Sequence, residues 1–276
     1  FSFWLVVFAQ SLIVSYVLWH ITIVINKTIS KRLFLIGLAL LSWFTGLGWY
    51  TSQIMPDIFT VTAIGTLLLL ALKKDYKIYQ KVIFSLLLVF SINAHFSNYL
   101  ISILTVLGLF VITRTKFIPK AKKELSFLLP TVIVTLSILM GSLINYAVGS
   151  TFKINQGSHV FLMGKMLDSG VLKSFLDDEC KNDNYVLCHC KDSLPVTSRE
   201  LLWNTNSPLY QNGGWTGSEK PFNDILFDIF TSPKHLALFY YNTILSSVSQ
   251  LFQNDVGSGL VSNWYKDPTS PPYAQI

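Results

Sequence analysis

Charged residues are scarce in this sequence. Only 13% of its 276 residues are Asp, Glu, Lys or Arg, whereas 51% are hydrophobic. A soluble domain carries about a quarter charged residues, so this composition excludes an ordinary water-soluble domain over the whole length. The apolar residues stand in long blocks and not in the periodic spacing of half-buried strands or helices. Such blocks predict segments that are surrounded by lipid.

The signature motifs of several enzyme classes are also missing. The sequence has no Gly-rich nucleotide loop, no His-Glu-x-x-His and no Gly-x-Ser-x-Gly, so nucleotide hydrolysis, zinc proteolysis and serine hydrolysis have no support. No cofactor is identified, and a divalent metal is left open without a motif that supports it. Because the sequence begins at Phe1 inside an apolar run, we expect it to be a piece of a longer protein.

Six apolar blocks predict an all-α membrane bundle of about six transmembrane helices, the transmembrane domain being residues 1–148. A helix needs about 20 residues to cross about 30 Å of hydrocarbon. The first and last blocks satisfy this, whereas the middle ones are short and need help from flanking residues or shielding by protein. The blocks are Phe1–Ile25, Leu33–Trp49, Ile58–Leu72, Val82–Ala94, Tyr99–Ile112 and Leu125–Val148.

The distribution of charge predicts the direction of the bundle. Residues 1–148 hold 12 Lys/Arg and 3 Asp/Glu, a net charge of +9, and residues 149–276 hold 9 and 12, a net charge of −3. With six spans, all twelve basic residues of the first part fall on one side, which is the cytoplasmic side by the positive-inside rule. We therefore predict a multi-pass protein of the bacterial inner membrane with a periplasmic C-terminal part. This placement accounts for the basic residues without nucleic-acid binding.

Residues 149–276 are predicted to form a mostly helical and irregular extracytoplasmic domain. The stretches 156–176 and 222–230 have the spacing of amphipathic helices. Residues 233–252 carry no charge after Lys234 but contain several Asn, Ser and Gln side chains. We therefore favour a membrane-associated helix, on the membrane surface or packed on the bundle, over a seventh span.

All three cysteines, Cys180, Cys188 and Cys190, lie in this second part. An oxidising compartment permits a disulfide, either Cys180–Cys188 or Cys180–Cys190, that closes a small loop. A metal site at Cys188-His189-Cys190 is less favoured, because successive residues of an extended segment point to opposite sides, which turns His189 away from both cysteines.

Polar residues at membrane depth are costly and are therefore candidate functional residues. Gln53 and Asp57 lie in one predicted outer turn, and His95 lies in the next. Asp57 directly follows Pro56, so it is explained either as a charge favoured by a helix N-terminus or as a carboxylate that lines a cavity. His95 is explained either as a structural hydrogen bonder or as a partner of Asp57 that positions a phosphate or a proton.

Basic and aromatic residues of the second part are further candidates. Lys153, Lys165 and Arg199 are placed to meet an anionic headgroup or pyrophosphate, although each also fits an ordinary surface charge. Four aromatic residues could stack on a sugar, cover the disulfide loop or rest on the membrane interface. They are Trp203, Tyr210, Trp215 and Trp264.

Four short segments resemble those of polytopic bacterial inner-membrane proteins whose layout is similar to the GT-C glycosyltransferases. The segments are Thr51-Ser-Gln-Ile-Met-Pro-Asp57, Asn93-Ala-His-Phe-Ser97, Gly157-Ser-His-Val-Phe161 and Leu202-Trp-Asn-Thr-Asn-Ser-Pro208. The resemblance implies a multi-span bundle with periplasmic loops around a cavity for a polyprenyl-phosphate-linked sugar. In that family the catalytic carboxylate lies in the first periplasmic loop, which here would precede Phe1. Asp57 and His95 are therefore not assigned its role.

The leading hypothesis is a membrane-embedded, GT-C-like glycosyltransferase fragment that uses a lipid-linked sugar on the periplasmic side. Its expected partners are the lipid bilayer, a polyprenyl-phosphate-linked sugar and other membrane proteins. The alternative is a non-catalytic integral membrane subunit of an envelope complex. A transporter is less favoured, because the sequence lacks repeat symmetry and paired broken helices.

Overall fold

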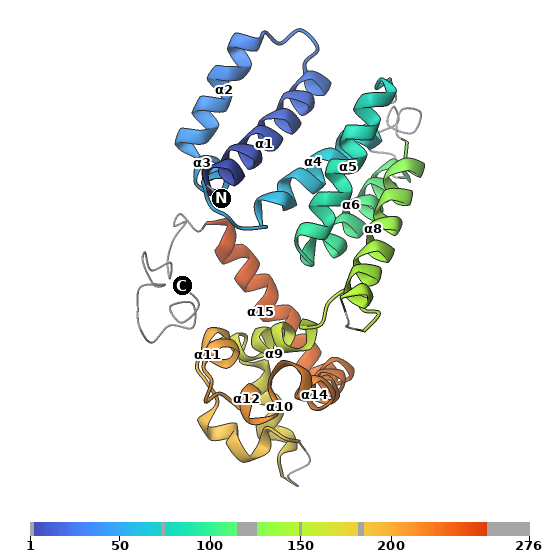
Figure 1. Cartoon of the computed structure of the whole chain (residues 1–276). Coiled ribbons are helices and arrows are strands. Elements are labelled where there is room, and N and C mark those ends of the chain that lie inside the picture. Colours follow the sequence, from blue (N-terminus) through green and yellow to red (C-terminus); the bar gives the residue numbers. More distant parts are fainter. Residues whose placement is uncertain (1–2, 73–74, 115–125, 149–150, 182–184, 253–276) are drawn as a thin grey trace. The chain divides into compact units, whose positions relative to one another are not determined.

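The computed structural model describes residues 3–72, 75–114, 126–148, 151–181 and 185–252 (Figure 1). All regular elements in these ranges are helices, and none is a strand. The chain divides into two compact units, Phe1–Asn155 (unit 1) and Gln156–Ile276 (unit 2). The division falls a few residues after the boundary that the sequence predicted. Each unit is described by itself.

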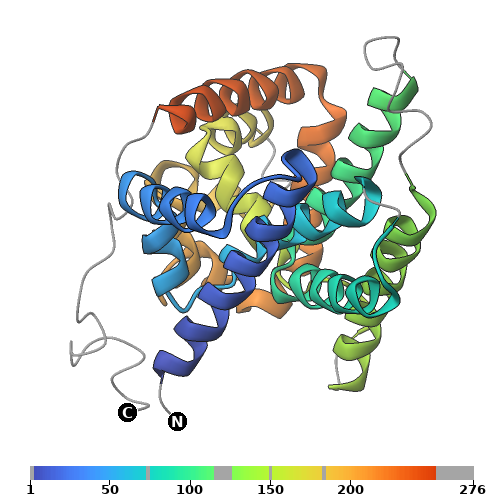
Figure 2. The ribbon, with the colours of Figure 1, turned by 90° about the horizontal axis from the view of Figure 1, so that it is seen from above.

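Unit 1 is a bundle in which α4 packs against α1, α5 and α6, and α8 packs against α5 and α6. α1 and α2 lie side by side, joined by a short loop (Figures 1 and 2). The helices are α1 (Phe3–Ile25), α2 (Lys31–Phe44), α3 (Leu47–Ser52), α4 (Ile58–Leu72), α5 (Ile78–Ala94), α6 (Ser97–Arg114) and α8 (Leu128–Ala147).

Small side chains on α4 make the close packing of unit 1 possible. Ala63, Gly65 and Thr66 are all buried. A Cβ atom at Gly65 would lie 2.6 Å from Val17 Cγ1 and 3.2 Å from Ile21 Cδ1 of α1, so only glycine allows this approach. Small residues serve the same purpose between helices in membranes, where the backbones must come close for packing to be favourable.

The exterior of unit 1 is apolar. α2 has no buried residue, and its large apolar side chains Trp43 and Phe44 are 85% and 78% exposed. Soluble monomers rarely expose contiguous apolar surface on this scale. Among the described helices, three (α1, α6 and α8) are long and apolar enough to cross a membrane, and α4 and α5 are shorter apolar helices of 15 and 17 residues.

Two apolar stretches are interrupted. The predicted block Leu33–Trp49 is not one helix, because α2 ends at Phe44 and α3 begins at Leu47. Between them, the backbone N–H and the hydroxyl of Thr45 both donate to the carbonyl of Leu41, which ends α2. The predicted separation of the blocks Val82–Ala94 and Tyr99–Ile112 is confirmed, since α5 ends at Ala94 and α6 begins at Ser97.

Unit 2 is a group of short helices around its own core. The predicted helix over residues 156–176 is divided at Gly170, whose φ of +70° favours glycine and ends one helix before the next begins. The elements are α9 (Ser158–Asp168), α10 (Val171–Glu179), η1 (Cys188–Ser193), α11 (Ser198–Trp203), α12 (Pro208–Gln211), α13 (Gly214–Gly217), α14 (Glu219–Thr231) and α15 (Pro233–Leu251).

The core of unit 2 is dense and apolar. Met163, Leu172, Phe175 and Phe222 are at most 2% exposed and belong to one cluster. A disulfide between Cys180 and Cys188, with Cα atoms 5.3 Å apart, joins the residue after α10 to the start of η1. The predicted disulfide is therefore present, and the structure selects Cys188 over Cys190 as the partner of Cys180.

Candidate functional site

The turn before α4 carries Gln53 and Asp57. The backbone carbonyl of Gln53 accepts a 3.1 Å hydrogen bond from Gln10 Nε2 of α1, which fixes this turn to the first helix. Asp57 directly precedes α4 and is exposed. Its position next to the first turn of α4 is favourable for a negative charge.

A buried polar network joins this turn to the next. Thr60 Oγ1 of α4 donates to Asn98 Oδ1 of α6 (2.7 Å), and Asn98 Nδ2 donates to the carbonyl of Ser91 in α5 (2.7 Å). The hydroxyls of Thr62 and Ser91 are also hydrogen-bonded (2.7 Å). Asn98 is fully buried and satisfies one of the carbonyls that the end of α5 leaves without a helical partner. One side chain thus holds three helices together.

His95 lies in the turn between α5 and α6, and its partners are local. Its Nδ1 atom is hydrogen-bonded to Ser97 Oγ (2.7 Å), and its ring stacks on Phe96 with centroids 4.9 Å apart. Thr60 lies three positions after Asp57, Asn98 lies three positions after His95, and these two residues are hydrogen-bonded to each other. The two turns therefore lie at the same end of unit 1, but the side chain of His95 is paired with Ser97 and not with Asp57.

Lys153 belongs to the same end of unit 1. Asn145, near the end of α8, donates from Nδ2 to the carbonyls of Lys153 (2.6 Å) and Ile154 (3.0 Å). α8 meets α6 where the Tyr99 ring packs against the backbone at Gly141, and Tyr99 Oη donates to Asn93 Oδ1 (2.7 Å). The structure thereby brings an exposed carboxylate, an imidazole and an ammonium-bearing residue to one end of the bundle.

Gln10 was not anticipated from the sequence. It is 2% exposed, and its Oε1 atom is buried without a hydrogen-bond partner in the part of the chain that the structure describes. A single amide inside an apolar block is a signal for an inward-facing polar group.

A shallow hollow lined by Trp19, Lys31, Phe34 and Leu35 lies at the other end of α1.

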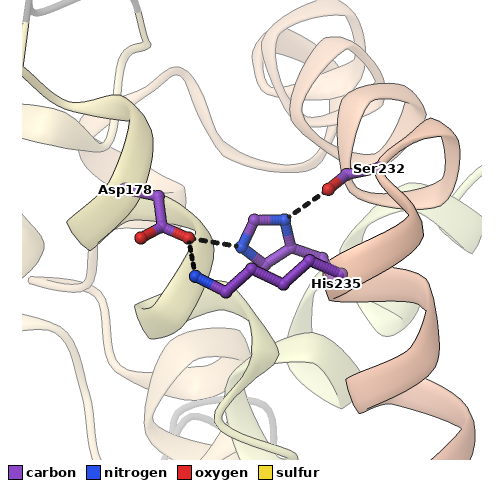
Figure 3. Close-up of polar contacts among 4 residues, drawn as sticks. Asp178, Ser232 and His235 are labelled. Carbon is purple, nitrogen blue, oxygen red and sulfur yellow. Dashed lines mark hydrogen bonds and ion pairs between the residues drawn. The ribbon is translucent and has the colours of Figure 1, made fainter.

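A second polar cluster lies in unit 2, between α10 and α15 (Figure 3). Asp178 Oδ2 accepts from Lys234 Nζ and, at 3.1 Å, from His235 Nε2. Because an ionised carboxylate only accepts, His235 Nε2 carries the proton. Its other nitrogen, Nδ1, is 2.8 Å from Ser232 Oγ. The hydrogen bond from Lys234, more than any other contact, lowers the pKa of the Asp178 carboxyl below its ordinary value.

This cluster contains a serine, a histidine and an aspartate, but its geometry is that of a clamp. In hydrolases the imidazole accepts the proton of a serine that faces the substrate. Here His235 is 2% exposed, and its ring meets Phe175 edge-on at 5.3 Å. Ser232 directly precedes α15, and Asp178 shares one oxygen between two donors. The cluster therefore fastens the first turn of α15 to the end of α10.

The remaining predicted binding residues of unit 2 flank the contact between α9 and α11. Lys165 follows Gly164, where a Cβ atom would lie 3.0 Å from both Ser198 Cβ and Leu202 Cδ1. Arg199 follows Ser198 and is exposed. Lys165 and Arg199 thus belong to two helices that pack against each other at Gly164 and Ser198.

The predicted aromatic surface forms in part. The Trp215 ring lies 5.4 Å from Phe161 and 5.9 Å from Trp203, centroid to centroid, and Trp203 is 63% exposed. Tyr210 instead donates its hydroxyl to the carbonyl of Leu202 (3.1 Å). Trp264 lies outside the described residues.

The cysteine-rich segment does not offer a three-ligand metal site, because Cys188 is bonded to Cys180. Cys190 is buried, and burial raises the pKa of its thiol.

Tyr185, nearby in sequence, donates to Asp228 Oδ2 of α14 (2.8 Å). Burial, followed by that carboxylate, raises the pKa of Tyr185 to about 12. Over the described ranges, no three His, Cys, Asp or Glu side chains gather as metal ligands.

The helical bundle, with its apolar exterior and its polar end, defines the chain at the level of a class: a helical protein with helices able to cross a membrane. Comparison with models of known protein families, with curated proteins and with solved structures finds no match.

Proposed function

We propose that this chain is the membrane-embedded part of a GT-C-like glycosyltransferase that takes sugar from a polyprenyl-phosphate donor outside the cytoplasm. The gathering of Asp57, His95 and Lys153 at one end of unit 1 supports the proposal. A donor of this class has an apolar tail, an anionic phosphate and a hydroxyl-rich sugar. An apolar bundle with a polar end that carries a cation offers chemistry for all three.

The proposal includes six membrane crossings, by α1, α2, α4, α5, α6 and α8. Consecutive crossings alternate in direction, so the polar end described above lies on one side of the membrane. The loops rich in Lys and Arg lie on the other side, which is the cytoplasmic side by the positive-inside rule. Unit 2 then follows the last crossing on the non-cytoplasmic side of a bacterial inner membrane.

Each polar residue has a distinct task in this account. Lys153 binds the donor phosphate through a charge-assisted hydrogen bond. Asp57 and His95 line the cavity in which the sugar lies, and Gln53 shapes its wall through the bond from Gln10. Lys165 and Arg199 of unit 2 stay predicted contacts for an anionic headgroup.

The first test measures binding of polyprenyl phosphate to the protein in lipid nanodiscs. Hydrogen bonds to charged groups contribute about 1.5–3 kcal/mol, so Lys153→Ala should weaken binding by roughly 10- to 100-fold. Lys173→Ala, a change at an exposed lysine of α10, is the matched control and should leave binding unchanged. Equal effects of the two variants would remove Lys153 from the site.

Asp57→Asn tests the proposed contact between Asp57 and the sugar of the donor. The measurement is the transfer of radiolabelled sugar from the same polyprenyl-phosphate donor. Asp75→Asn is its control, because Asp75 is an exposed carboxylate just beyond the opposite end of α4. A selective loss in Asp57→Asn supports a lining role for Asp57.

The pairing of His95 with Ser97 favours the alternative function, a non-catalytic membrane subunit. In that case His95 only shapes the turn between α5 and α6. Neither polyprenyl phosphate binding nor sugar transfer would then be observed for the protein.

A further inference from the structure

The second half of α15 exposes an unbroken apolar surface. Six side chains of this segment, here called the α15 apolar face, are between 47% and 81% exposed. Sparse exposed apolar residues are ordinary, but a contiguous set marks an interaction surface. The face consists of Tyr240, Tyr241, Ile244, Leu245, Val248 and Leu251.

The α15 apolar face points away from the core of unit 2. At about 100° per residue its six members occupy an arc of about 140°. The side chains that hold α15 on unit 2 occupy a different side of the helix, centred roughly 140° away on the same wheel. They are His235, which is bonded to Asp178, Leu238 and Phe239, which pack on the core, and Asn242, which donates to the carbonyl of Ser169 (2.8 Å).

The chemistry of the face fits the interface of a lipid bilayer. Residues 235–252 contain no Asp, Glu, Lys or Arg, and Lys234 is paired with Asp178, so the helix after its first turn offers a charged protein partner no complementary site. Tyrosine is enriched where a membrane meets water, because its ring is apolar and its hydroxyl is polar. The opposite side of the helix carries Ser246, Ser249 and Gln250, which suits contact with water.

The sequence also keeps unit 2 near a membrane. α8, one of the candidate spans, ends at Ala147, and unit 2 begins at Gln156. The eight residues between them, 148–155, reach at most about 29 Å when fully extended. Part of that length is held back, because Asn145 binds the carbonyls of Lys153 and Ile154.

We propose that α15 lies in the plane of the membrane, with its apolar face in the boundary between headgroups and acyl chains. A helix of this kind sinks about 5–10 Å below the surface. α15 is not among the helices apolar enough to cross a membrane, and its polar side would meet hydrocarbon if it did. The clamp at Asp178 fixes the start of α15 on unit 2, so the helix anchors that unit to lipid. This inference rests on the part of the proposed function that places unit 1 in a membrane, and it does not depend on sugar transfer.

Spin labels placed along α15 test the proposal in the whole protein reconstituted in liposomes. The background is Cys190→Ser, which leaves the Cys180–Cys188 disulfide intact. Labels at positions 241, 244, 245 and 248 should be accessible to oxygen and shielded from a water-soluble nickel chelate. Labels at 246, 249 and 250 should show the reverse. Calibration with spin-labelled lipids should place the first set in the interfacial layer.

Other outcomes would overturn the proposal. Protection from both reagents on the apolar face means that protein covers it, whether unit 1, a second copy or another chain. Access of the nickel chelate means that the face is in water, and a label at the bilayer centre means that α15 spans. In the liposome-reconstituted protein, Leu245→Asp should make unit 2 more susceptible to added protease, because the helix no longer inserts into the lipid. Ser246→Asp should leave the protease susceptibility of unit 2 unchanged. Because this readout needs no donor lipid, its failure is separate from that of the proposed function.

Discussion

Asp178 carries the polar bonds that hold α15 to α10. One of its two carboxylate oxygens, Oδ2, accepts from both Lys234 and His235, which lie in the first turn of α15. The carboxylate of Asp178 is partly exposed and the imidazole of His235 is buried. The bond to His235 is therefore less accessible to water than the bond to the exposed Lys234. The hydrogen bond from Lys234 is the main reason that the pKa of Asp178 is lowered.

Asp178→Asn should loosen α15 at neutral pH. Since folding lowers the pKa of Asp178, its stabilising effect is present above the ordinary Asp pKa of about 3.9 and is lost as pH falls through the lower native value. Hydrogen exchange of α10 and α15, corrected for intrinsic rates, should be faster in Asp178→Asn than in the control Asp177→Asn at pH 7. The difference should shrink in strong acid. A difference independent of pH would contradict an electrostatic clamp.

Asn98 acts at the scale of elements, because its side chain contacts two other helices and is fully buried. Asn98→Leu removes the donor to Ser91 and the acceptor for Thr60 in an apolar setting, leaving both without their partner. Each unsatisfied buried group costs about 1–3 kcal/mol, so we expect a loss of a few kcal/mol in the free energy of unfolding. Denaturation in mixed micelles measures it.

The control for that prediction is Leu100→Ala, two positions along α6, where the side chain is 61% exposed. If Asn98→Leu proves as stable as the wild type, the network does not join the three helices. An increase in stability would mean that apolar packing outweighs the hydrogen bonds at this site.

The helices were predictable from apolar blocks, and the break between α5 and α6 from polar residues at 93–98. The polar contacts were not, because they depend on residues distant in sequence. Thr60 and Asn98 are 38 positions apart, and Asp178 and His235 are 57 apart. The local signal at Ser232-Pro233 marks a helix start but does not reveal the carboxylate that the helix meets. Gly170 was a visible helix breaker, yet the amphipathic spacing around it favoured one long helix.

At the scale of the whole molecule, the two units follow different physical rules. Unit 1 exposes its apolar side chains and buries Gln10, Asn98 and Ser137, as expected where lipid is the solvent. Unit 2 buries an apolar core and is cross-linked by Cys180–Cys188. This contrast is the basis for the proposal that unit 1 lies in the membrane.

The central claim is that the end of the bundle carrying Asp57, His95 and Lys153 faces away from the cytoplasm. Its most direct test labels single cysteines in spheroplasts with a membrane-impermeant maleimide, in the Cys190→Ser background. The account predicts that Met55→Cys and Phe96→Cys react in intact spheroplasts, whereas Thr28→Cys and Asp75→Cys react only after permeabilisation. Labelling of Met55→Cys and Thr28→Cys from the same side would contradict the crossing of α2 and with it the six-span bundle.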